Sequence, residues 1–463
     1  MNRRTVLKSL STATAVGIAG CQGDRSGQGE PRSSSTSTPT EVQTESSEQK
    51  KTETTQTEQE TDEPNQSTHY VAPDGDDSNS GSREEPLASV HEALTRVGPA
   101  ERITVAPGEY FEEHEPGEPL RTIRGGEPGA PITITGPETA VVRPGIRIKH
   151  SHVRLEGLTF EALLDPSNPD DPASYFDYPV GIRPMPGSDD YVEDIVCAPA
   201  AVGYSAYALI RVVRAKDIEI GPTRITGLAG ASWILSEEPG RHAGEIIYLG
   251  SPPGMVFDTI DPKVDYPWEG EIDQTRNVHI HHIDNSAGHP HSELVDAKVG
   301  TQDILVEYCT DGGGSQNTED YQPASIRLGS FDATIRWCKL HDGSGDGIQI
   351  NTGNRYLFQD VDVSSIGPSD IGTGIEIYGN RVTGFENADL MLRTGHPDPN
   401  ERRFDPIGPA DLRKLCGNVI PNVFTEQLDY TAKKRVNIEQ PTCSDDTPEG
   451  DDIGHTGGES PWS

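Results

Sequence analysis

The sequence is poor in apolar residues and in positive charge. Only 32% of its 463 residues are hydrophobic, and 38 Lys and Arg stand against 75 Asp and Glu, a net charge of −37. That charge repels a phosphate backbone, so nucleic acid is excluded as a partner. Lysine is the scarcer base, with 11 Lys to 27 Arg. We interpret the acidic, lysine-poor composition as that of a halophilic protein; the alternative is an acidic surface that only aids solubility.

Long apolar runs and metal-type cysteine spacings are also missing. Residues 13–19 form a short apolar stretch, which cannot span a bilayer. The six cysteines contain no CxxC pair, which counts against a zinc site.

The first 21 residues have the features of an export signal. Arg3 and Arg4 precede the apolar stretch, which runs on to Ile18-Ala19-Gly20-Cys21. The order predicts twin-arginine export, a lipidated Cys21 and a lipid-anchored, extracellular protein on the cell surface. The alternative is a plain cleavable signal peptide, which also places the protein outside the cytoplasm.

Composition divides the rest of the chain into three parts. Residues 22–68 are rich in Ser, Thr, Glu and Gln, which predicts a disordered tether. Residues 441–463 are acidic and Gly-rich, which predicts a disordered tail. Residues 69–440 remain as the folded domain, and we expect it to be a monomer.

A repeat sets the expected fold of this domain. Similar strand-like phrases begin at residues 277, 303, 332 and 355, in steps of 26, 29 and 23 residues, with related phrases at 152 and 217. Each repeat carries a second short strand that ends near a glycine, at 245–250, 295–300, 325–329, 347–350 and 374–377. Such a unit cannot bury its apolar side alone, so neighbouring units must stack. The pattern predicts an all-β fold, a parallel β-helix.

The start of the domain is consistent with this fold. A helical run at 87–97 lies between two strand-like segments, where it would cap the first coil. Over about 69–380 the pattern resembles the right-handed parallel β-helix proteins of the pectate-lyase-like superfamily.

Aligning the second strands on their closing glycines predicts which side chains face outward. The uniformly apolar positions must point inward, and the residues between them outward, because strand side chains alternate. The predicted outward column is Tyr248, Lys298, Arg327, Gln349 and Glu376.

This register makes Lys298 and Arg327 stacked neighbours, about 4.8 Å apart. Repulsion favours the neutral form of lysine, since arginine cannot lose its proton. Lys298 is then a candidate base and Arg327 a partner for a substrate anion, as β-elimination in a uronate-containing glycan requires. The alternative is an ordinary solvated face, which concentrated salt would screen.

Part of the domain resembles the alginate lyase and chondroitinase B family. The match covers residues 245–251, 293–298 and 326–329. It implies Lys298 as base, Arg327 on the next coil, and Glu293 as a calcium ligand. His291 and His242 stand where the family has other oxygen ligands, which counts against Ca2+. Glu293 with Asp296 could still form a weak calcium site.

Other residues complete the predicted site. Tyr248 and His291 are candidate acids, while Gln349, Glu376 and Trp268 are candidate substrate-binding residues. The leading hypothesis is an extracellular polysaccharide lyase acting on an anionic glycan. One alternative is a glycoside hydrolase using Asp342 or Asp346. Another is a non-catalytic, surface-anchored carbohydrate-binding or structural β-helix protein.

Overall fold

The computed structural model describes residues 67–235, 244–251, 273–315, 323–352, 375–394, 418–429 and 432–437, apart from residues 116, 187, 189 and 299. The predicted export signal with Cys21, nearly all of the tether, and the acidic tail lie outside these residues. Within them, no helix has the length and apolar character needed to cross a bilayer.

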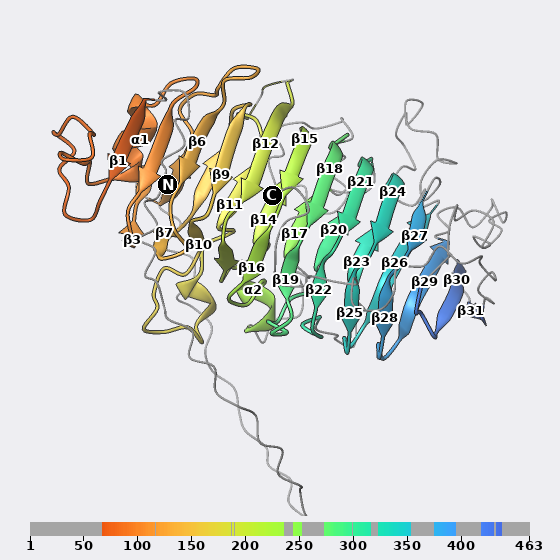
Figure 1. Ribbon diagram of the computed structural model, residues 1–463. Coiled ribbons are helices and arrows are strands. Elements are labelled where there is room, and N and C mark those ends of the chain that lie inside the picture. The colour runs from red at the N-terminus through yellow and green to blue at the C-terminus, as the bar shows by residue number, and fades with distance from the viewer. Residues whose placement is uncertain are drawn as a thin grey trace, which may run out of the picture. The chain divides into compact units, whose positions relative to one another are not determined.

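The described strands form three sheets whose neighbours come from successive coils (Figure 1). The ten-stranded sheet contains β1 (Thr68–Val71), β2 (Arg102–Val105), β6 (Ile132–Thr135), β9 (Val153–Glu156), β12 (Val192–Ala198), β15 (Ala215–Ile220), β18 (Arg276–His281), β21 (Gln302–Glu307), β24 (Phe331–Arg336) and β27 (Glu376–Tyr378).

The nine-stranded sheet contains β3 (Gly108–Phe111), β7 (Ala140–Arg143), β10 (Thr159–Glu161), β13 (Ala201–Gly203), β16 (Thr223–Ile225), β19 (Ile283–Asn285), β22 (Thr310–Asp311), β25 (Lys339–His341) and β28 (Arg381–Thr383).

The twelve-stranded sheet contains β4 (Glu113–Glu115), β5 (Glu118–Arg121), β8 (Ile146–Ile148), β11 (Val180–Ile182), β14 (Ile210–Val212), β17 (Ile247–Leu249), β20 (Val295–Ala297), β23 (Ala324–Leu328), β26 (Asp346–Thr352), β29 (Ala388–Thr394), β30 (Val423–Asp429) and β31 (Ala432–Asn437). Its pairs are parallel except β4 with β5 and β30 with β31. The predicted right-handed parallel β-helix is confirmed.

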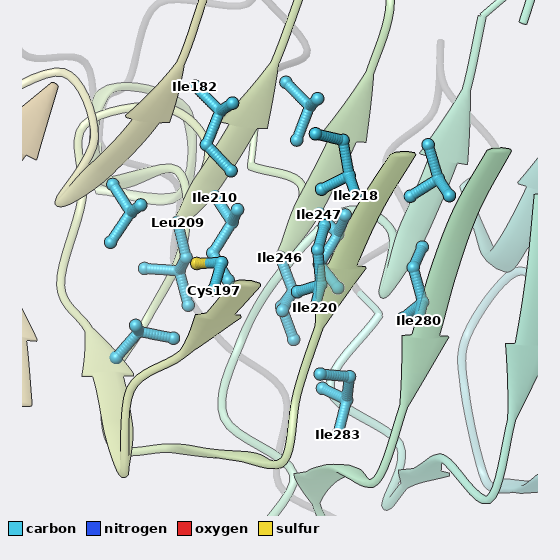
Figure 2. Close-up of a cluster of buried hydrophobic side chains, with 14 of the residues drawn as sticks. Ile182, Cys197, Leu209, Ile210, Ile218, Ile220, Ile246, Ile247, Ile280 and Ile283 are labelled. Carbon is cyan, nitrogen blue, oxygen red and sulfur yellow. The ribbon is translucent and has the colours of Figure 1, made fainter. Parts of the chain in front are cut away.

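The core is the space that the three sheets enclose. Figure 2 shows Ile218 and Ile280 of the ten-stranded sheet, Ile283 of the nine-stranded sheet, and Ile210 and Ile247 of the twelve-stranded sheet in one cluster. Each coil contributes only a few such side chains, so most of their burial comes from the coils above and below.

The start of each repeat phrase has a backbone explanation. Asp217, Asn277, Asp303 and Asp332 have φ values of 58°, 51°, 53° and 50°, and they lie at corresponding positions of β15, β18, β21 and β24. Asn and Asp tolerate this left-handed conformation better than other non-glycine residues. Asn277 Nδ2 also donates to Asp217 Oδ1 one coil away. The recurring Asx residue therefore marks a recurring irregularity in the strand.

The helix α1 (Val90–Arg96) covers the N-terminal coils. Ser89 caps it by accepting a hydrogen bond from the Glu92 N–H, and Glu92 pairs with Arg96 one turn later. Its apolar side is buried and packs near β1, β2 and β5. The capping helix expected at 87–97 is therefore present with narrower bounds. Two short elements, η2 (Pro172–Ser174) and α2 (Ala231–Ile234), lie in connections between strands.

Candidate functional site

The candidate site lies on the outward face of the twelve-stranded sheet. Tyr248 on β17 is in register with Asp296 on β20, Asp296 with Arg327 on β23, and Arg327 with Gln349 on β26. The column therefore reads Tyr248, Asp296, Arg327, Gln349.

The predicted register was wrong at β20. Asp296, not Lys298, lies opposite Arg327, so Lys298 and Arg327 are not stacked neighbours. Lys298 follows the strand, and its backbone N–H donates to the Leu249 carbonyl at 2.9 Å. A shift by two residues keeps the same side of the strand facing inward, so the apolar pattern could not exclude it.

Two predicted substrate-binding residues are not placed in this column. Glu376 was assigned to it wrongly: it belongs to β27 of the ten-stranded sheet, where it pairs with Thr334. The strand that follows β26 in the twelve-stranded sheet is β29, with Met391 opposite Gln349. Trp268 and His242 lie outside the described residues.

Asp296 of this column lies close to two further carboxylates. Glu245, Glu293 and Asp296 are all buried, and each offers an oxygen within 4.8 Å of the others. Burial, together with the charges of Glu293 and Asp296, raises the pKa of Glu245 to about 7, against the opposing charge of Lys298. We call these three residues the acidic triad.

Two cations lie against the acidic triad. Arg327 Nη1 is 2.9 Å from Glu293 Oε1, and its Nε donates to Gln349 Oε1 at 3.0 Å. Lys298 Nζ pairs with Asp296. With all five groups ionised, three negative and two positive charges leave one negative charge. Lys298 and Arg327 thus each contact a different carboxylate of the acidic triad, whereas the predicted stacking of one on the other is wrong.

Tyr248 forms one wall of this arrangement. Its ring lies between two cations, with the Arg211 guanidinium carbon 5.0 Å and Lys298 Nζ 4.6 Å from the ring centroid. Such cation–π contacts hold the cations in place over the ring face. Burial raises the pKa of the phenol, so Tyr248 stays protonated and keeps a hydrogen to donate.

The acidic triad has the donor chemistry of a site for a hard divalent cation. Ca2+ prefers oxygen ligands, and carboxylates from Glu245, Glu293 and Asp296 supply them at short mutual separation. Glu293 and Asp296 were predicted as this pair. Glu245 was missed, although it stands two residues before the inward Ile247 just as Glu293 stands two before Val295. His291 is not among these ligands.

His291 serves a different environment. It is fully buried, and its Nε2 lies 3.0 Å from Asp311 Oδ1. Asn285 and Ser325 also donate to the Asp311 carboxylate. Burial opposes ionisation of Asp311, but these partners lower its pKa below the usual value. His291 therefore belongs to an internal polar network and does not face a polymer.

The pair considered for hydrolysis is split by its surroundings. Asp346 is fully buried on β26 and accepts a hydrogen bond from Asn387, whereas Asp342 is exposed and contacts His341. Hydrolysis with two acids needs both carboxyl groups to reach one glycosidic bond, and a buried Asp346 beside an exposed Asp342 does not meet this requirement.

The comparisons with known proteins give one short family match and several similar solved structures. A family model described as "Protein of unknown function (DUF1565)" matches residues 73–125. The sequence has no significant match among curated proteins.

Several solved structures are similar to the chain. An alginate lyase from Paenibacillus sp. str. FPU-7 is 16% identical, with 66% of this chain and 90% of that chain covered and a TM-score of 0.43. Pectate lyase Pel9A is 12% identical, with 70% and 78% covered and a TM-score of 0.45. A GH136 lacto-N-biosidase from Eubacterium ramulus is 11% identical, with 71% and 59% covered and a TM-score of 0.43. The chemistry must therefore be argued from the residues of this chain.

Proposed function

We propose that the protein is an extracellular, lipid-anchored polysaccharide lyase that cleaves an anionic, uronate-containing glycan by β-elimination. The observation that carries this proposal is the convergence of Lys298, Arg327 and Tyr248 around the acidic triad.

Each residue has a role in the proposed reaction. Lys298 Nζ accepts the proton on the carbon beside the uronate carboxylate, and Arg327 binds that carboxylate while negative charge builds on it. The electrons of the broken C–H bond form a carbon–carbon double bond, and the glycosidic C–O bond breaks. Tyr248 donates its proton to the leaving oxygen. A divalent cation held by Glu245, Glu293 and Asp296 would supply further stabilisation of the carboxylate charge.

A non-catalytic glycan-binding role is the second candidate. It is favoured by the ion pairs of the site, since Lys298 and Arg327 already contact the carboxylates of Asp296 and Glu293. In that role the same face would bind the glycan without cleaving it.

The test is a cleavage assay in concentrated salt with alginate, pectate and glycosaminoglycans. A lyase produces unsaturated uronates, which absorb ultraviolet light, and we expect Lys298→Ala to lose at least a hundredfold in rate, as removal of a general base does. Lys339→Ala is the matched control, because Lys339 is exposed on the nine-stranded sheet. Unchanged activity in Lys298→Ala would refute the base assignment. Binding of a glycan without products would favour the second candidate.

A further inference from the structure

A second group of cations occupies the same sheet nearer the N-terminus. Arg121 ends β5 and is in register with Arg147 on β8. Lys149 follows β8, and Arg183 follows β11, where its backbone N–H donates to the Ile148 carbonyl. These four residues, which we call the four-cation cluster, come from three successive coils.

The four-cation cluster is partly buried, and no ion pair joins it to an acidic residue of the described ranges. Lys149 is only 8% exposed, and its Nζ has no ion pair or hydrogen bond to any residue in the described ranges. Arg183 Nε is buried and likewise has no hydrogen-bond partner there. A buried cation normally has a partner, because the loss of water is otherwise uncompensated.

Within the cluster, Arg147 is held in place by its contacts with Tyr178. Its Nη1 donates to the Tyr178 carbonyl at 2.8 Å, and its guanidinium carbon lies 3.8 Å from the Tyr178 ring centroid. The side chain passes over Gly181, where an added Cβ would come within 2.5 Å of the Tyr178 ring and 2.8 Å of Arg147 Cδ. Glycine at this position therefore gives Arg147 and Tyr178 the room to pack against the sheet.

The charges of the cluster act on the pKa of Lys149. Burial, together with the charges of Arg183, Arg147 and Arg121, lowers its pKa to about 7, while the exposed Glu118 opposes them. Like charges on neighbouring coils repel one another. An anion bound among the four residues would remove this repulsion.

The four-cation cluster and the acidic triad lie on one continuous face. The outward column that contains Arg121 and Arg147 continues through Gly181 and Arg211 to Tyr248. Four coil steps separate Lys149, after β8, from Lys298, after β20. At about 4.8 Å per step the two lysines are about 19 Å apart along the coil axis.

We propose that Arg121, Arg147, Lys149 and Arg183 form a distal subsite that binds a carboxylate or sulfate group of the same glycan chain. The inference rests on the proposed function, because it assumes that the chain also occupies the face above the acidic triad. A chain that spans both places gains affinity from the subsite, whereas a short fragment bound at Lys298 cannot reach it.

The test compares polyuronate fragments shorter and longer than the span, using Lys149→Met and Arg183→Gln. For long fragments we expect KM to rise about tenfold in either variant, with kcat unchanged; for short fragments neither constant should change. Lys216→Met is the control, since Lys216 pairs with Glu193 on the ten-stranded sheet. Unchanged KM for long fragments in both variants would overturn the subsite. Circular dichroism verifies that each variant is folded.

Calorimetry separates failure of the subsite from failure of the proposed function. If no fragment is cleaved, weaker binding of long polyuronate to Lys149→Met than to the unaltered protein still supports the subsite. Equal binding overturns it. Inorganic sulfate is the small-anion probe. Suppose that Lys149→Met loses sulfate binding, but that long and short fragments bind this variant as tightly as they bind the unaltered protein. The cluster then binds a free anion, and the glycan subsite is wrong.

Discussion

The acidic triad and the four-cation cluster are two charged regions on one sheet face, but they balance their charge differently. At the acidic triad, Lys298 and Arg327 each meet a carboxylate. At the four-cation cluster, Lys149 meets none among the described residues. The first region is compensated from within and keeps its geometry without a ligand, whereas the second gains its compensation only from an anion. Charge balance thus distinguishes a self-supporting site from one that depends on its ligand.

The largest effect is expected from breaking the balance at the acidic triad. Arg327→Met leaves Glu293 buried without the guanidinium that faces it, and we expect the free energy of unfolding to fall by about 3 kcal/mol. Urea denaturation measures the change. In the double variant with Glu293→Gln, most of the loss should be recovered, because the buried charge is gone. A loss below about 1 kcal/mol in the single variant would show that Glu293 does not depend on Arg327.

A smaller effect of opposite sign is expected at the four-cation cluster. Lys149 has a folded-state pKa of about 7, below the roughly 10.4 of an unfolded lysine, so the unfolded chain binds more protons between these values. The stability of the unaltered protein should therefore rise with pH from about 7 to about 10. Lys149→Met should be more stable by about 2 kcal/mol below pH 7, after allowance for solvent screening, and the difference should narrow as pH rises.

Denaturation of both proteins across this pH range checks the prediction. A Lys149→Met variant that is less stable than the unaltered protein at pH 6 would mean that Lys149 is compensated, and the contrast between the two regions would disappear.

The smallest effect is expected at an exposed ion pair. Arg224 and Glu138 contact one another, but both side chains are 51% exposed. Arg224→Gln should change the free energy of unfolding by less than about 0.5 kcal/mol, because water and salt screen such a pair. The same denaturation assay applies. A loss comparable to that of Arg327→Met would show that burial is not what distinguishes the acidic triad.

The fold was predictable because two features recur in each coil: the apolar residues of the core and a residue in the left-handed backbone conformation. Asp217, Asn277, Asp303 and Asp332 mark one left-handed position in successive coils, so the phrases that begin with them could be aligned. The phrase beginning at Arg355 falls outside the described residues.

The candidate site was predictable only in part. The sequence pointed to Lys298, Arg327 and Tyr248, but it missed Glu245 and placed β20 in the wrong register. Val295 and Ala297 are as suitable for the two inward-facing positions of this strand as Ala297 and Val299. The sequence alone therefore allowed either alignment. The closing Gly300 favoured the wrong one, because β20 ends at Ala297 and Gly300 lies in the turn that follows, which the Thr301 N–H closes by donating to the Lys298 carbonyl. Hydrogen bonding between coils, which decides the register, has no counterpart in the sequence.

The four-cation cluster was missed for another reason. Its residues come from coils whose strands, β5, β8 and β11, are only three or four residues long and were not recognised as repeats. The available signal was the alternation of Ile146-Arg147-Ile148-Lys149 with Ile182-Arg183. This alternation indicates a cluster only once the two segments are known to stack. In the structure Ile148 pairs with Ile182, which is 34 residues later in the sequence.

The reversed strands at both ends of the twelve-stranded sheet have a consequence for association between molecules. A bare parallel edge is a template on which another copy could continue the winding, as in a growing fibre. Here β4 runs antiparallel to β5 at one end, and β31 runs antiparallel to β30 at the other. An incoming parallel coil would meet a strand of the wrong direction at either edge. On this sheet, the chain thus ends its own coil in a way that opposes filament growth.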